Sequence, residues 1–267
     1  MLLLALSACV SDQPLSERQA GAVWVPSSNF DARRARLIVL HHTDMHSAQS
    51  ALNTLRTRNL HGRVSAHYLI GRDGALYQLV ADDARAWHAG ASRWGDLTDL
   101  NSMSIGIELD YDSASADDAV AGYAPAQIER LIALLRDLTT RLEIPPQAVI
   151  GHGDVAPTRK RDPGVQFPWA QLAQAGFGWW PRAVLAAPPA GFDAWAALRL
   201  IGYDLRDPAA ALRAFHRHFR GHEADGWQPG DAEILFDLQR QRMAMPEVDA
   251  NALPTPPADP APSASML

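Results

Sequence analysis

Histidine and aspartate residues placed where strands end or loops begin are the first candidates for chemistry in this sequence. His41 follows the apolar run 37–40, His152 lies in the segment 151–154 (Gly-His-Gly-Asp), and Asp162 comes ten residues later. Two imidazoles and one carboxylate, with a fourth position left to water, form the ligand set of a catalytic zinc site. Because the three residues come from separate segments, their spacing alone leaves ordinary core or surface histidines as the alternative.

The segments that must position these residues alternate between strand and helix patterns. Compact apolar runs predict strands at residues 37–40, 67–70, 75–80 and 104–110. The residues between the middle two, 71–74 (Gly-Arg-Asp-Gly), predict a hairpin turn. Apolar residues at helical spacing predict a helix over 125–142 with Pro125 in its first turn, and another helix is expected near 48–58. Strands interleaved with helices indicate an α/β layer fold.

The character of the chain changes after residue 181. Helical patterns near 192–200, 208–219 and 231–242 predict a small all-helical domain. Beyond it the chain is rich in Pro, Ala and Ser with little to bury, so a disordered tail is expected. The expected segments are a signal remnant (1–9), a polar tether (10–34), a domain with the candidate site (35–181), the helical domain (182–243) and the tail (244–267).

Charge and hydropathy exclude some classes of partner. The 267-residue chain has a formal net charge of −6, and its densest basic run, residues 159–161, has three members. Binding to phosphates needs clustered Lys and Arg, so no nucleic-acid partner is expected. No run reaches the roughly 18 to 20 apolar residues of a membrane-spanning helix.

The single cysteine, Cys9, ends the run 6–9 (Leu-Ser-Ala-Cys), which resembles the lipobox of bacterial lipoproteins. The resemblance implies that Cys9 carries a lipid, so that the membrane is reached by this anchor only. A missing basic start and a short apolar segment leave an incidental cysteine as the alternative. Val10, in place of the aspartate that retains lipoproteins at the inner membrane in enterobacteria, implies the periplasmic face of the outer membrane.

Six short motifs occur in one order, at residues 37–43, 65–70, 86–90, 104–109, 151–154 and 160–164. Together they resemble the type-2 N-acetylmuramoyl-L-alanine amidases, which share their fold with peptidoglycan recognition proteins. The resemblance spans about residues 35–181. It implies a central mixed β-sheet flanked by helices. It also implies hydrolysis of the amide bond between N-acetylmuramic acid and L-alanine in peptidoglycan or muropeptides.

Carried over residue by residue, the resemblance implies that His41, His152 and Asp162 bind one zinc ion per chain. His41 rather than His42 is assigned because the ligand directly follows the apolar strand. Glu108, which closes a strand rich in Ile and Leu, is expected to be the general base, and Lys160 is expected to stabilise the oxyanion. An ordinary surface glutamate and a solvated lysine are the alternatives.

Substrate contacts are expected from Trp87, His88, Asn101 and Ser102, which would offer a stacking face and hydrogen-bonding groups. The helical segment resembles small three-helix peptidoglycan-binding domains, so we expect it to add wall binding while all chemistry lies before residue 181. A monomer is expected. The competing interpretations are a recognition module that binds peptidoglycan without cutting it, and an amidase for another small amide.

Overall fold

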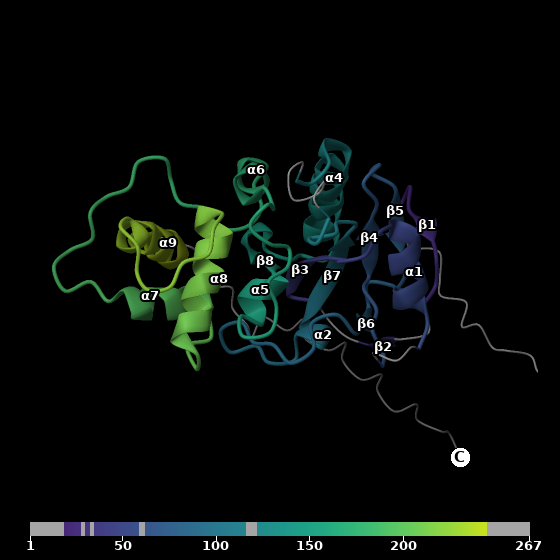
Figure 1. The fold of residues 1–267 in the computed structure, drawn as a ribbon, viewed down its shortest axis with the longest axis horizontal. Helices are drawn as coiled ribbons and strands as arrows, with labels where there is room; N and C mark the ends of the chain where they lie inside the picture. The colour runs from purple at the N-terminus through teal and green to yellow at the C-terminus, as the bar shows by residue number, and fades with distance from the viewer. Residues whose placement is uncertain (1–18, 28–29, 33–34, 59–61, 116–121, 245–267) are drawn as a thin grey trace, which may run out of the picture.

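The computed structural model describes residues 19–27, 30–32, 35–58, 62–115 and 122–244. Its centre is a six-stranded sheet (Figure 1) in the order β1 (Val23–Trp24), β5 (Leu76–Gln78), β4 (Tyr68–Ile70), β7 (Ser104–Leu109), β3 (Leu37–His42) and β8 (Val149–Gly151). Within this sheet only β4 and β5 pair antiparallel, and they form the predicted hairpin. The other four pairings are parallel. The predicted mixed sheet is therefore confirmed.

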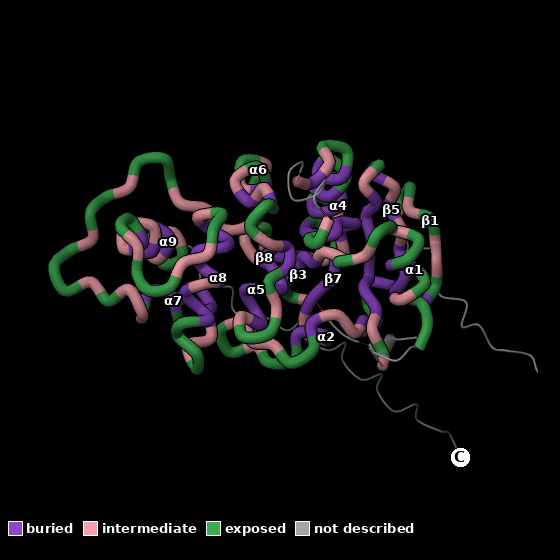
Figure 2. The backbone as a smooth tube through the Cα atoms, viewed as in Figure 1, coloured by how far each residue is buried: buried purple, intermediate pink, exposed green. Residues whose placement is uncertain are grey.

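Both faces of the sheet are covered, because its central strands are apolar on both sides. Figure 2 shows β3, β4 and β7 buried along most of their lengths. Ile38 and Leu40 of β3 pack with α4 (Pro125–Arg141), whose apolar stripe starts after Pro125 at its N-terminus. Leu37 and Val39 point to the opposite face, as the alternation of a strand requires. His41 follows them on that second face.

The second face carries the short elements that surround the site. They are α2 (Leu100–Met103), α5 (His152–Val155) and the helical turn η2 (Pro146–Ala148), whereas α6 (Trp169–Gln174) packs on the first face, in the same core as α4. Beside the hairpin, α1 (Ala48–Arg56) buries Leu52 and Leu55 against Leu69 and Leu79. Ser47 caps α1 by accepting a hydrogen bond from the backbone N–H of Ser50 at 3.2 Å.

Part of the segment expected to be a tether joins the sheets. β1 extends the main sheet beside β5, and β2 (Phe30–Ala32) pairs antiparallel with β6 (Ala84–Ala86). The strand β1 has two residues and β2 has three, which are too few to show an apolar periodicity. The strands with which they form backbone hydrogen bonds, β5 and β6, lie far along the chain. The expectation of a tether through residue 34 is therefore wrong for residues 23–24 and 30–32.

Three helices, α7 (Ala194–Ile201), α8 (Pro208–Arg220) and α9 (Asp231–Ala244), stand together at one end of the molecule (Figure 1). Leu198, Phe215 and Leu235 form the centre of their common core. A buried ion pair also holds this unit together, since His216 Nε2 lies 2.8 Å from Asp231 Oδ2. The predicted helical region is confirmed.

Within the described ranges, no helix is long and apolar enough to cross a bilayer. Cys9, the signal remnant and residues 245–267 of the expected tail lie outside the described residues.

Candidate active site

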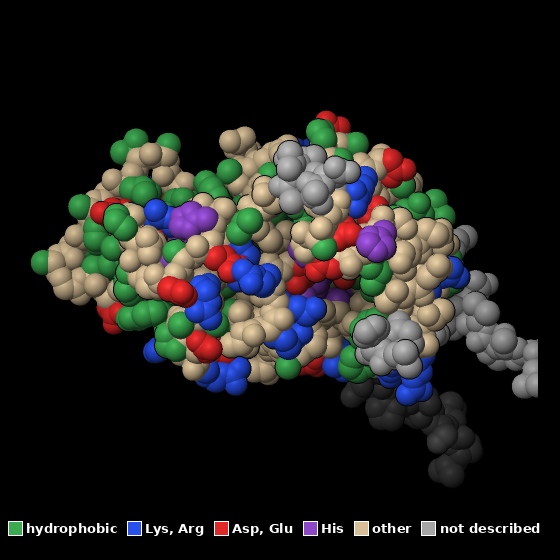
Figure 3. All heavy atoms as spheres, viewed as in Figure 1, with side chains coloured by type: hydrophobic (Ala, Val, Ile, Leu, Met, Phe, Trp, Pro, Cys, Tyr) green, Lys and Arg blue, Asp and Glu red, His purple; other side chains and the backbone are tan. Residues whose placement is uncertain are grey.

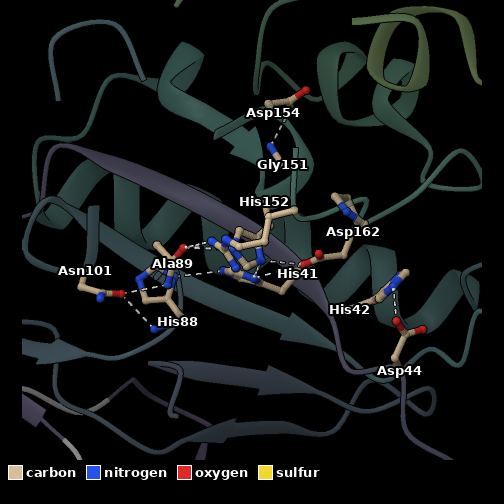
Figure 4. A network of polar contacts seen from close by, with 12 residues as sticks. His41, His42, Asp44, His88, Ala89, Asn101, Gly151, His152, Asp154 and Asp162 are labelled. Atoms are coloured by element: carbon tan, nitrogen blue, oxygen red, sulfur yellow. Dashed lines mark hydrogen bonds and ion pairs between the residues drawn. The ribbon is translucent and has the colours of Figure 1, made fainter. Parts of the chain in front are cut away.

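Three side chains of the type that binds metals meet at one point. His41 Nδ1 lies 2.9 Å from His152 Nδ1 and 3.2 Å from Asp162 Oδ2, and that oxygen lies 3.0 Å from His152 Nδ1. All three residues are buried, and they are the one group in the part of the chain that the structure describes whose ligand atoms lie close enough together to hold a metal ion. In Figure 4 both imidazoles and the Asp162 carboxylate point toward one another. The three ligands predicted from the sequence are thus brought together.

Adjacent strands and the loops that follow them deliver these side chains. His41 ends the buried part of β3, and α5 begins with His152 directly after the neighbouring strand β8. The loop with Asp162 is attached to α5, because the backbone N–H of Gly153 donates to the Asp162 carbonyl oxygen at 2.7 Å. The register of β3 and β7 places Glu108 directly beside His41. Paired residues of adjacent strands point to the same face, so Glu108 shares the face of the cluster.

The hydrogen bond on the far side of the His152 ring determines where its proton lies. His152 Nε2 is 3.1 Å from the Ala89 carbonyl oxygen. A carbonyl oxygen only accepts, so Nε2 carries the hydrogen and Nδ1 keeps its lone pair. An imidazole held in this way is oriented and tautomerised for a metal.

A longer chain of hydrogen bonds does the same for His41. The Ser104 hydroxyl donates to the Leu100 carbonyl oxygen at 2.5 Å, so Ser104 Oγ accepts from His88 Nε2 at 3.3 Å. The other ring nitrogen, His88 Nδ1, then accepts from His41 Nε2 at 3.0 Å. His41 Nδ1 is left with a lone pair that points to His152 and Asp162.

The electrostatics of the cluster favour the forms that bind a cation. Burial lowers the pKa of the His41 imidazole to about 4, and repulsion from His152 adds to this effect. Burial alone would raise the pKa of the Asp162 carboxyl, but the charges and hydrogen bonds of His152 and His41 outweigh it and hold that pKa well below its usual range. Near neutral pH the site therefore offers a neutral His41 and an ionised Asp162.

The donor set fits a tetrahedral divalent ion. Ligand bonds of about 2.0–2.1 Å at tetrahedral angles place the ligand atoms roughly 3.3 Å apart. The three separations in this cluster, 2.9, 3.0 and 3.2 Å, come close to that value. Three protein ligands leave one position for water or substrate, which is the composition of a catalytic rather than a structural site.

Glu108 and Lys160 lie beside this cluster. Glu108 is partly exposed, with Oε2 buried and without a hydrogen-bond partner among the described residues. Burial, and then the charge of Asp162, raise the pKa of Glu108 well above its usual range, whereas the Lys160 charge lowers it. The Lys160 charge also lowers the pKa of His41. A proton acceptor and a cation therefore face the same site.

Comparison with known proteins agrees with this geometry. The family model described as N-acetylmuramoyl-L-alanine amidase matches residues 31–165. The N-acetylmuramoyl-L-alanine amidase AmiD of Escherichia coli (strain K12) is 38% identical over 269 residues, which cover 89% of this chain and 96% of AmiD. The chain belongs to the N-acetylmuramoyl-L-alanine amidase family. The predicted family, fold and enzyme class are confirmed.

Two solved structures extend the likeness beyond the catalytic domain. One is the E. coli AmiD complex with the substrate anhydro-N-acetylmuramic acid-L-Ala-D-γ-Glu-L-Lys, with a TM-score of 0.66, 35% identity and coverage of 84% of this chain and 93% of that one. The other is AmpDh3 from Pseudomonas aeruginosa in complex with anhydromuramic pentapeptide, with a TM-score of 0.67, 31% identity and coverage of 90% and 99%.

The residues predicted to line the substrate groove of this amidase have different surroundings. Trp87 lies under the guanidinium groups of Arg63 and Arg85, at 4.8 and 4.1 Å from its ring centre. Asn101 is 6% exposed, and its Oδ1 accepts from the backbone N–H groups of His88 and Ala89 at 3.0 and 2.8 Å. These contacts are all within the protein, so Asn101 holds the segment that orients His41 and His152.

The other predicted residues also have defined positions. His88 orients His41, and Ser102 is half-buried in α2 with its backbone N–H bonded to Asp99. Contact of Trp87, His88, Asn101 and Ser102 with substrate stays a prediction. His42, which was not assigned as a ligand, stacks on Tyr111 with ring centres 5.4 Å apart and turns toward Asp44 (Figure 4).

Two features of the amidase site were not visible in the sequence. Gly106 faces His88 so closely that a Cβ there would lie 2.4 Å from its Cγ. Asp154, two residues after His152, is 3% exposed and binds two side chains of the helical unit, Tyr203 and His218. The motif that contains Asp154 could have drawn attention to it, but nothing local indicates its partners.

Proposed function

We propose that this amidase uses one zinc ion, bound by His41, His152 and Asp162, to hydrolyse the amide bond between N-acetylmuramic acid and L-alanine in peptidoglycan fragments. The observation that carries the proposal is the triangle of Nδ1, Nδ1 and Oδ2 atoms, with Glu108 beside His41 on the adjacent strand. Charged and histidine side chains gather at the centre of the face shown in Figure 3.

The reaction divides between the metal and the side chains near it. Zinc supplies Lewis acidity, which makes water acidic near neutral pH and polarises a carbonyl group. Glu108 takes the proton from the attacking water and passes it to the departing nitrogen of L-alanine. Its raised pKa brings it nearer to the working pH, where a general base is most effective. The ammonium group of Lys160 stabilises the negative charge that develops on the carbonyl oxygen.

The proposed substrates are muropeptides, a muramic acid with a peptide linked through L-alanine, like the substrate named for the AmiD complex; the AmpDh3 complex holds an anhydromuramic pentapeptide. Incubation with a defined anhydromuropeptide should release the free sugar and the intact peptide, which mass spectrometry distinguishes. Cleavage at another amide bond would show that the proposed substrate bond is wrong. Binding without cleavage by a zinc-loaded protein would favour a recognition module instead.

The identity of the metal has its own test. Protein purified without added metal should contain one zinc per chain by elemental analysis, and a chelator should abolish its activity. A metal content near zero, with activity unchanged by chelator, would contradict both the zinc and its role.

We further propose that the protein is a monomer anchored at the periplasmic face of the outer membrane by a lipid on Cys9, within residues 6–9 (Leu-Ser-Ala-Cys). Intact-mass analysis of membrane-extracted protein should show a diacylated Cys9 at the N-terminus. Recovery of a soluble protein with a free thiol would contradict the anchor. The Cys9→Ser variant should then remain in the soluble fraction with its turnover of small muropeptides unchanged.

A further inference from the structure

The short helix α5 carries His152, and its orientation depends on a buried carboxylate at its third position. Asp154 Oδ2 accepts from the backbone N–H of Gly151 at 2.8 Å. The same oxygen accepts from His218 Nδ1 at 2.7 Å, and Oδ1 accepts from the Tyr203 hydroxyl at 2.8 Å. Tyr203 and His218 both belong to the helical unit, at 2% and 6% exposure. Two of these three hydrogen bonds to the carboxylate therefore come from outside the catalytic domain.

The His218 ring is fixed on its faces as well as at its edge. It stacks on Trp169 of the catalytic domain with ring centres 3.8 Å apart and planes at 13°. On the helical unit, Phe219 lies 4.3 Å away. A ring held in this way presents Nδ1 to Asp154 in one direction only.

The loop that carries Asp162 is attached to the same unit. Glu223 accepts from Arg161, the neighbour of Asp162, and from Arg217 of α8 at 2.8 Å. Arg217 also lies against the backbone of α5, because a Cβ on Gly153 would be 2.5 Å from its Nη1. The helical unit thus contacts the elements of two of the three proposed ligands.

We propose that the three-helix unit is part of the metal centre: Tyr203 and His218 hold Asp154, and through it α5, in the position where His152 meets His41 and Asp162. Tyr203 and His218 are positioning residues, since neither touches the ligand cluster. This inference rests on the proposed function. It assigns to the helical unit a role besides the wall binding expected from the sequence.

The test uses the full chain with both donors replaced by rings of similar size, Tyr203→Phe together with His218→Phe. Aromatic packing remains, but Asp154 loses two hydrogen bonds. Zinc transfer to a colorimetric chelator should then show affinity lowered by about 10- to 100-fold, the usual effect of losing a group that supports a ligand. The single His218→Asn variant keeps a donor near the Nδ1 position and should retain zinc like the unchanged protein.

The matched control is His222→Ala, an exposed histidine of the same unit. It should leave zinc affinity unchanged. If the double variant binds zinc as tightly as the unchanged protein while folded, the inference is wrong. If the double variant does not fold, Tyr203→Phe alone should weaken zinc binding by a smaller factor, and no loss there would equally overturn it.

A second measurement separates this inference from the proposed function. The backbone N–H groups of Gly151 and Gly153 are both bonded within this network, to Asp154 and Asp162. Their hydrogen exchange in metal-free protein should accelerate in the double variant and not in His222→Ala. Unchanged exchange would refute the positioning role. A protein that binds no zinc but shows the accelerated exchange would instead refute the proposed function alone.

Discussion

Glu108 and His41 lie side by side on adjacent strands, yet the proposed chemistry gives them separable tasks. Glu108→Gln should retain zinc and fold but lose turnover by roughly 10²- to 10⁴-fold, because it removes a proton acceptor. His41→Ala should lose turnover and zinc together. Elemental analysis paired with muropeptide turnover measures both effects. Near-normal turnover of Glu108→Gln would show that the base has been misassigned.

Two charges near Glu108 should move the pH dependence of the amidase in opposite directions. Glu108 acts as a carboxylate, so activity rises as the pH rises through its pKa. Burial and the charges of Asp162 and Asp44 raise that pKa, whereas the charge of Lys160 lowers it. The acidic limb of kcat/KM should therefore shift to higher pH in Lys160→Met and to lower pH in Asp44→Asn. Asn tolerates the positive φ of 47° at residue 44.

The size of the rate effect separates the two variants further. Lys160→Met should also slow turnover by about 10²- to 10³-fold, because the cation that stabilises the oxyanion is gone. Asp44→Asn should leave the plateau rate nearly unchanged. Shifts of the same sign in both variants would show that another group controls the acidic limb.

At the scale of elements, β7 supports His88 by having no side chain at Gly106. Gly106→Ala would place a methyl group within 2.4 Å of the His88 ring, which should cost about 1–3 kcal/mol in the free energy of unfolding. His88→Ala removes the ring and should make the second substitution nearly neutral. Urea unfolding of both single variants and the double variant gives the coupling. Purely additive losses would show that the strand itself, rather than the ring, resists the methyl group.

Elements with an apolar pattern or a turn signal beside them were predictable, whereas short elements without such a signal were not. The apolar run 37–40 and the stripe of α4 give the central strand and the long helix, whereas β6 and β8 have three residues each and α5 has four. The ligands His41, His152 and Asp162 were found through their motifs. The Asp154 contact with His218 spans 64 positions, and no local pattern encodes such a distance.

The whole molecule should unfold as one unit, since the helical unit and the catalytic domain share buried polar contacts. Calorimetry should give a single transition for the zinc-loaded protein. Chelation should move it to lower temperature without splitting it, with a loss of about 2.7 kcal/mol when zinc is present at 100 times its Kd. Adding zinc back should restore the original transition. Two transitions, of which only one responds to zinc, would show that the parts unfold independently.

The segment of residues 183–191, the long green loop at the left of Figure 1, is largely exposed. The contacts between the parts of the chain before and after this loop do not depend on it: the Gly95 N–H donates to the Gly202 carbonyl oxygen at 2.7 Å, and Arg182 binds Asp237 at 2.7 Å. A protease that nicks this loop would break one peptide bond and leave these contacts in place. The two fragments would then stay associated as a split enzyme. Two shorter bands on a denaturing gel would therefore not show that the amidase is inactive.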